Sequence, residues 1–210
     1  MRVKLRHHSP QRMVFKAGEL HGNVVLNFGN SPEDELAPYA GAFHEAAQVL
    51  VHKMEISHGY SDLDACPIVF LYRHALELYC KAIVLAGNDL MRILGKKCPI
   101  ASNAIWHHKI GTLLPAMGEI FRAVNWEWEK GLGGFDSFQQ LKTFISEIES
   151  IDPNSDAFRY PIKRTGEATM PKNFLFNVID YAEKMDKLLD LLDGAAMGIG
   201  AMFDDICAAQ

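Results

Sequence analysis

The sequence predicts an all-α protein, an antiparallel up-and-down bundle of four to five main helices. Apolar residues recur at three- and four-residue intervals in five segments, which is the period of one helix face. Hydrophobic residues make up 49% and charged residues 22% of the chain, the balance of an ordinary globular domain. At 210 residues, the chain is long enough to bury about 70% of its unfolded surface, so the bundle needs no disulfide or metal.

Residues 1–31 differ from the rest of the chain. Five positive charges precede the first acidic residue, Glu19: Arg2, Lys4, Arg6, Arg12 and Lys16. Val24-Val25-Leu26 is typical of a short β element or of a strap across the domain. We therefore divide the chain into a basic arm (1–31), a helical bundle domain (32–194) and an apolar C-terminal tail (195–210). The arm is either a surface segment or a contact for phosphate.

The first helix is expected over about residues 40–58, after a capping pattern that begins at Ser31-Pro32. Pro38 either kinks this helix or starts a second segment. One apolar face carries Phe43, Ala46, Ala47, Leu50, Val51 and Met54. His44 and His52 lie on a neighbouring face with no third ligand near them, so we expect partly buried histidines and no metal site.

The second helix is expected over about residues 63–86 and has a broad apolar face. Arg73, Glu77 and Lys81 follow one another at four-residue steps along the edge of that face. The simplest interpretation is a solvated stripe with two weak intrahelical ion pairs. His74, inside so apolar a helix, favours instead a half-buried edge.

Gly87-Asn88 is expected to end the second helix. Three further helices and one long loop follow: a helix over about 105–124 with His107 and His108 at its start, a helix from Asp136 or Ser137 to about Ile151, a loop over 152–172 with three prolines, and a helix over about 173–192. The tail after Gly194 is expected to extend the last helix against a partner or a second copy.

The composition also limits the class of protein. A net charge of −5 and a pI near 6.0 argue against a protein that coats nucleic acid by bulk charge. No run of about 20 apolar residues is present, so no membrane span is expected. The four cysteines have no zinc spacing, which favours a cytoplasmic protein with reduced thiols and without a metal or other cofactor.

Three motifs together resemble those of HEPN-like bundle proteins, in particular uncharacterised bacterial members. Residues 70–81, Phe-Leu-Tyr-Arg-His-Ala-Leu-Glu-Leu-Tyr-Cys-Lys, are similar to an Arg-His-Ala-x-Glu-Leu-x-x-Lys helix of that family. Residues 108–114 resemble its His-x-Leu-x-x-Leu helix start, and residues 155–161 its Phe-Arg-Tyr-Pro loop. The resemblance spans residues 62–192. It implies a four-helix up-and-down bundle, frequently dimeric, of the kind found in toxin–antitoxin, phage-defence and RNA-processing systems.

The ribonuclease members of that family carry an arginine and a histidine, separated by four to six residues, on a late helix. Only Arg2 has this spacing here, with His7 and His8 in the arm. Residues 173–210 contain no arginine and no histidine. The usual nuclease motif is therefore absent from the bundle helices, which favours a protein that is not an enzyme.

A different set of polar residues is the candidate site. Its members come from the second helix, the start of the third and the long loop: Arg73, His74, Glu77, Lys81, His108, Asp156, Arg159 and Tyr160. In one interpretation Arg159 docks on Glu77 and fixes the loop to the bundle, so that Arg159→Ala costs several kcal/mol. In the other, the set forms a pocket for a phosphate or carboxylate, with His108 or His74 moving a proton.

Three functions follow from these alternatives. The first is a HEPN-like protein that binds RNA, a nucleotide or a partner protein, in a toxin–antitoxin, defence or stress system. The second is a metal-independent ribonuclease or nucleotide-processing enzyme that uses His108 or His74 with Arg73 and Arg159. The third is a structural homodimer formed through the apolar tail residues: Met197, Ile199, Met202, Phe203 and Ile206.

Overall fold

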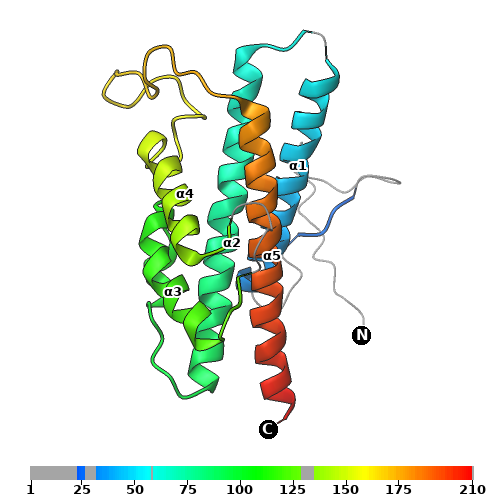
Figure 1. The fold of residues 1–210 in the computed structure, drawn as a ribbon, viewed down its shortest axis with the longest axis vertical. Coiled ribbons are helices and arrows are strands. Elements are labelled where there is room, and N and C mark those ends of the chain that lie inside the picture. The colour runs from blue at the N-terminus through cyan, green and yellow to red at the C-terminus, as the bar shows by residue number, and fades with distance from the viewer. Residues whose placement is uncertain (1–22, 27–31, 58, 129–134, 210) are drawn as a thin grey trace, which may run out of the picture.

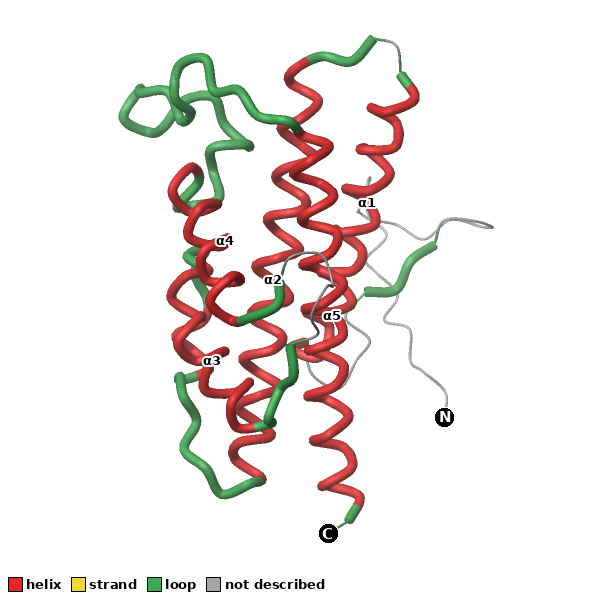
Figure 2. Tube along the Cα trace, in the orientation of Figure 1, coloured by secondary structure: helices red, strands yellow, loops and turns green. Residues whose placement is uncertain are grey.

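The computed structural model describes residues 23–26, 32–57, 59–128 and 135–209. All regular structure in these residues is helical, without a β-strand (Figures 1 and 2). The five α-helices are α1 (Leu36–Ile56), α2 (Ala65–Ile93), α3 (Leu114–Ala123), α4 (Phe138–Ile151) and α5 (Val178–Ala208). The all-α prediction is therefore confirmed. None of the described helices is apolar over a length that would cross a membrane.

Helix α2 is the centre of the molecule, and α1, α3 and α5 all pack against it (Figure 1). Most of its length is enclosed, and Tyr72, Leu76 and Ile83 are fully buried. Burying one such side chain contributes about 1.5–3 kcal/mol, so this helix contributes most to the core. Polar residues in the middle of α2, such as Arg73 and Glu77, are consequently surrounded by protein, whereas Arg92 near its end is exposed.

Helix α2 passes through Gly87-Asn88, where the sequence predicted its end. At Gly87 the helix lies so close to α3 that a Cβ atom would come within 2.5 Å of Cδ1 of Ile120. The buried Asn88 side chain donates from Nδ2 to the carbonyl of Ile100 at 2.9 Å. The glycine therefore serves helix packing and the asparagine anchors the next connection.

The third predicted helix is shorter than expected, because α3 starts only at Leu114. Two short 3-10 helices, Ser102–Ile105 and Ile110–Leu113, precede it, and His107 and His108 lie in irregular backbone between them. Side chains satisfy that backbone: Thr112 Oγ1 donates to the carbonyl of Lys109 at 2.7 Å, and the amide of Gly111 donates to Glu149 Oε1 at 2.9 Å. Such bonds compete with helix formation.

Helix α4 agrees with the prediction at both ends, and the Ser137 hydroxyl accepts a hydrogen bond from the amide of Gln140. Helix α5 does not, because it starts at Val178 rather than 173. Asn177 Oδ1 caps it by accepting from the amides of Ile179 and Asp180. The loop between α4 and α5 is confirmed and is five residues longer than expected (Figure 2).

The C-terminal tail has no separate structure, since α5 continues through Gly194, Gly198 and Gly200 to Ala208. Each internal glycine costs about 1 kcal/mol relative to alanine. Burial of apolar residues such as Ile199 offsets that cost. The helical extension predicted for the tail is therefore present in the structure.

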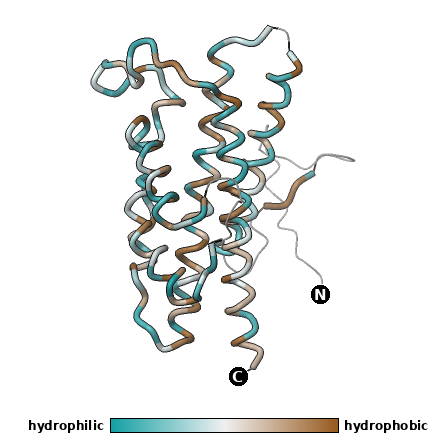
Figure 3. The backbone as a smooth tube through the Cα atoms, viewed as in Figure 1, coloured by the Kyte–Doolittle hydropathy of each residue, from teal (hydrophilic) through white to brown (hydrophobic). Residues whose placement is uncertain are grey.

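In the N-terminal arm the structure describes only residues 23–26, and these form no strand. Val24, Val25 and Leu26 are exposed, and the segment is hydrophobic along its length (Figure 3). The predicted β element is therefore wrong for residues 23–26, since the described part of the chain contains no strand. The basic residues of the arm lie outside the described residues.

Candidate functional site

The charged row on α2 is buried, contrary to the solvated stripe. The side chains of Arg73, Glu77 and Lys81 are 0%, 2% and 7% exposed. Arg73 Nη1 donates to Glu77 Oε2 at 3.4 Å, and Lys81 Nζ donates to Glu77 Oε1 at 2.7 Å. Because a buried charge is tolerated only when it is paired, the row forms one connected unit.

Arg73 connects this charged row to the segment before α3 and to the start of the α4–α5 loop. Its Nη2 donates to the carbonyl of His108 at 3.0 Å and to the carbonyl of Asp152 at 3.1 Å. Its Nε lies 3.4 Å from Asp152 Oδ2. The other oxygen, Asp152 Oδ1, accepts from the amides of Asp156 and Ala157. Arg73 and Asp152 thus hold the long loop to the bundle.

Asp152 was not among the site residues predicted from the sequence. Its signal was present, because an aspartate that directly follows a helix and precedes Pro153 is typical of a side chain that accepts from amides further along the chain. Asp156 contributes only its backbone to the loop, by donating to Asp152 and by accepting from the amides of Arg159 and Tyr160.

Glu77 also contacts His108, the more exposed of the two predicted catalytic histidines. His108 Nδ1 lies 3.0 Å from Glu77 Oε1, and the imidazole is 58% exposed. Burial raises the pKa of Glu77, but the hydrogen bond and charge of Lys81, together with His108, outweigh it and leave that pKa below its usual value. A buried carboxylate therefore orients an exposed imidazole.

His74 takes no part in this contact. Its ring packs against Phe43 at 4.5 Å and stacks on Phe70 at 5.7 Å between centroids. Burial lowers the pKa of His74, with the charge of Glu77 opposing that effect and nearby cations adding to it. The sequence predicted a polar residue in an apolar setting, and the structure places His74 in contact with two aromatic rings.

Arg159 does not dock on Glu77, so that predicted pair is wrong. The Arg159 side chain donates to the carbonyl of Ser155, and its guanidinium lies 5.5 Å from the Phe70 ring centre and 5.4 Å from that of Tyr160. Arg159 and Tyr160 are exposed. The partners of Glu77 come instead from its own helix and from His108, which are closer along the chain and already in place.

We therefore expect Arg159→Ala to lower the free energy of unfolding by less than about 1 kcal/mol, because exposed cations contribute little. Urea denaturation monitored by circular dichroism measures the change. Lys163→Ala, another exposed cation in the same loop, is the matched control. A loss of several kcal/mol for Arg159→Ala alone would contradict this placement.

A second polar cluster, which the sequence did not predict, joins three helices. Asp186 Oδ1 on α5 accepts from Tyr72 OH at 2.8 Å and from Gln48 Nε2 at 3.1 Å, and lies 2.7 Å from His44 Nε2. His44 is buried, as predicted, and His52 is exposed. The described residues contain no group of three or more potential metal ligands. This cluster crosslinks α1, α2 and α5.

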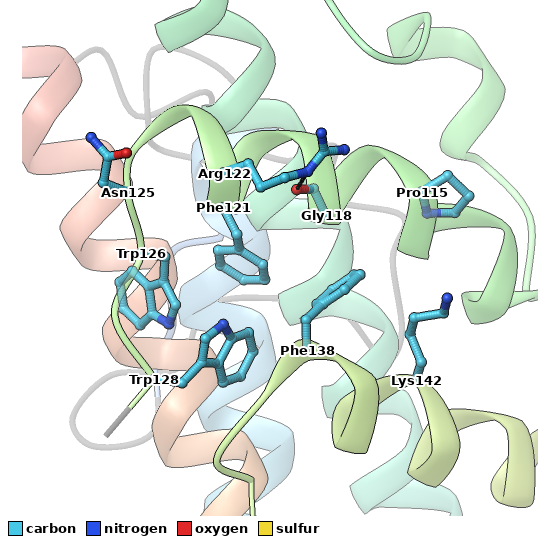
Figure 4. Close-up of a pocket in the computed structure, with 9 residues that line it drawn as sticks. All are labelled: Pro115, Gly118, Phe121, Arg122, Asn125, Trp126, Trp128, Phe138 and Lys142. Carbon is cyan, nitrogen blue, oxygen red and sulfur yellow. Dashed lines mark hydrogen bonds between the residues drawn. The ribbon is translucent and has the colours of Figure 1, made fainter. Parts of the chain in front are cut away.

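One cavity in the described residues has aromatic walls and was not anticipated (Figure 4). It measures about 590 Å³ and lies between the end of α3 and the start of α4. Phe121 is the central ring of its wall. The ring centroids of Trp126, Trp128 and Phe138 lie 5.6, 5.5 and 5.9 Å from that of Phe121. Gly118 permits this packing, because a Cβ there would lie 2.8 Å from the Phe138 ring.

Two cations stand at the rim of this aromatic pocket. Arg122 and Lys142 are exposed, and neither has a carboxylate partner among the described residues. Trp126 Nε1 is buried and lacks a hydrogen-bond acceptor in that part of the chain. The pocket therefore combines flat apolar faces, one free buried donor and two accessible positive charges.

No known family matches this chain, and no match is found among curated proteins or solved structures.

Proposed function

We propose that this is a HEPN-like helical-bundle protein that binds single-stranded RNA, with a base held in the aromatic pocket. The observation that carries the proposal is the convergence of Phe121, Trp126, Trp128 and Phe138 in one pocket (Figure 4). Its rim holds two cations, neither of which has a carboxylate partner among the described residues. Stacking of a base on an aromatic side chain contributes about 1–3 kcal/mol. Arg122 and Lys142 would meet the phosphates on either side of that base.

The charge of the whole chain fits local rather than bulk recognition. With a net charge of −5, the protein repels a polyanion except where cations gather. The pocket rim is one such place. Affinity would therefore come from a stacked base and a few phosphates, which suits a short single-stranded segment better than a long duplex.

The HEPN-like, antiparallel form of the bundle belongs to the same proposal. The motif over 70–81 lies on α2, and the Phe-Arg-Tyr-Pro motif lies in the α4–α5 loop that Arg73 and Asp152 hold to that helix. This contact supports the view that the motifs form one unit. A role in toxin–antitoxin, defence or stress systems is proposed from the resemblance.

Binding is favoured over catalysis because Arg73, one of the two cations in the predicted catalytic set, is occupied, whereas the other, Arg159, is exposed in the loop. Arg73 and Lys81 are buried and bonded within the protein, so neither meets a phosphate. One observation does favour metal-independent RNA cleavage as a second function: His108 is exposed while Glu77 holds its Nδ1. Cleavage of labelled RNA in EDTA by wild type, lost in a folded His108→Ala variant, would support it.

Homodimer formation also stays a proposal. Met197 and Met202 on α5 are exposed and available for a contact, whereas Ile199 is buried within the chain's own bundle. Sedimentation velocity would decide whether this face joins two copies.

We expect Trp128→Ala to weaken binding of a labelled single-stranded oligonucleotide at least 10-fold, because it removes a stacking face. Fluorescence anisotropy at fixed salt measures the change. Trp106→Ala is the matched control, since Trp106 is 54% exposed and lies outside the pocket. Equal loss in both variants, or none in either, would contradict the assignment of the pocket.

The salt dependence provides a second arm of that experiment. Replacing Arg122 and Lys142 by glutamine should flatten the slope of log Kd against log salt by about 1.4 if each contacts one phosphate. An unchanged slope would remove the rim cations from the binding site.

A further inference from the structure

A second cavity lies under the α4–α5 loop and shares no lining residue with the aromatic pocket. It measures about 290 Å³ and is bounded by α2, α4, α5 and the loop. Apolar side chains form most of its wall: Phe144, Ile148, Phe158, Phe174 and Phe176. A cavity of this size and lining is suited to a small organic molecule of roughly ten to fifteen non-hydrogen atoms.

Two residues that line this cavity each carry a buried donor atom with no acceptor in the described part of the chain. Tyr181 OH makes no hydrogen bond, and the Nε of Arg73 makes none either. The 3.4 Å contact of that Nε with Asp152 Oδ2 is an ion pair without hydrogen-bond geometry. Arg73 is fully buried, so no solvent satisfies it. Buried polar groups are almost always bonded, and two orphans in one cavity call for an explanation.

The protonation states of Tyr181 and Arg73 determine which kind of hydrogen-bond partner the two groups lack. Burial raises the pKa of Tyr181, with a smaller opposing effect of Arg73, so the phenol keeps its proton and is a donor. Arg73 is a donor only. Because Arg73 and Lys81 balance Glu77 and Asp152, the surrounding cluster is close to neutral. The cavity thus lacks an oxygen acceptor and does not require a particular charge.

We propose that this cavity binds a small, mainly apolar ring compound whose carbonyl or carboxylate oxygen accepts from Tyr181 OH and Arg73 Nε. The ring packs among the phenylalanines of α4 and the loop. Lys184, Glu147 and Asp180 stand at the mouth and supply no strong field of one sign. The proposal of this site does not rest on RNA binding, because the two cavities share no lining residue.

The test compares three probes of nearly equal shape: phenylacetate, phenylacetamide and ethylbenzene. Binding to the full chain is measured by saturation-transfer NMR. We expect one or both acceptor compounds to bind at least 10-fold more tightly than ethylbenzene. Tighter binding of phenylacetate would identify a carboxylic acid as the ligand class, and tighter binding of phenylacetamide a neutral carbonyl compound.

Tyr181→Phe removes only the hydroxyl and is the decisive variant. It should weaken the acceptor compounds about 10-fold and leave ethylbenzene unchanged. Its melting temperature should equal or exceed that of wild type, because an unbonded buried hydroxyl is lost. Tyr160→Phe, at an exposed tyrosine outside the cavity, should match wild type in every measurement.

Absence of binding by both acceptor compounds would overturn the proposal, as would equal affinity of all three probes for wild type. Unchanged acceptor affinity in Tyr181→Phe would also overturn it. None of these outcomes bears on Trp128 and RNA, so the two proposals fail separately.

Discussion

Replacing Arg73 with methionine is expected to lower the free energy of unfolding by about 3–5 kcal/mol, the usual cost of breaking a buried ion pair. The change leaves Asp152 without its cation and the carbonyls of His108 and Asp152 without their common donor. Urea denaturation followed by circular dichroism measures the loss. Arg92→Met is the matched control, because the Arg92 side chain is 64% exposed and pairs only with Asp89 at the surface.

Arg73→Lys is a second variant whose free energy of unfolding can be measured if the methionine variant does not fold. Lysine keeps the charge but lacks the planar fork that reaches two carbonyls and a carboxylate at once. We expect a loss smaller than that of methionine but larger than that of Arg92→Met. Equal stability of Arg73→Met and Arg92→Met would show that the buried row is not what holds the loop.

Gly87→Ala is expected to destabilise the protein by about 1–3 kcal/mol, although alanine favours a helix. The added methyl group would lie within 2.7 Å of three side-chain carbons of Ile120, which is itself fully buried. Thermal and urea unfolding measure the change.

Gly200→Ala is the matched control for this glycine. It too is inside a long helix, but its Cβ position has no neighbour within 4 Å. We expect it to stabilise the protein by about 0.5–1 kcal/mol through helix propensity alone. A stabilising Gly87→Ala would mean that α2 and α3 do not approach each other as described.

The sequence predicted what depends on local pattern. The helix faces, the Ser137 cap and the proline-rich loop all follow from spacing and residue type within one segment. It failed at Gly87-Asn88, where a glycine typical of a helix end serves contact with Ile120 instead. That contact belongs to a distant segment, and no local rule contains it.

The candidate site was likewise predicted only where it depends on local pattern. The four-residue spacing of Arg73, Glu77 and Lys81 predicted the charged row and its internal ion pairs. The resemblance to HEPN-like proteins pointed to His108, which contacts Glu77. Which loop residue would meet the row depended on the path of the chain after α4, and Asp152 rather than Arg159 lies there. The aromatic pocket escaped prediction because Trp126 and Trp128 lie outside any periodic segment.

Helix α4 has a consequence for how the two cavities act together. Its first turns supply Phe138 and Lys142 to the aromatic pocket, and its later turns supply Phe144 and Ile148 to the second cavity. A ligand that restrains this helix at one end reduces the conformational entropy still to be lost at the other. Binding at the two sites would then be linked by a coupling free energy, and linkage requires each ligand to change the affinity of the other by the same factor.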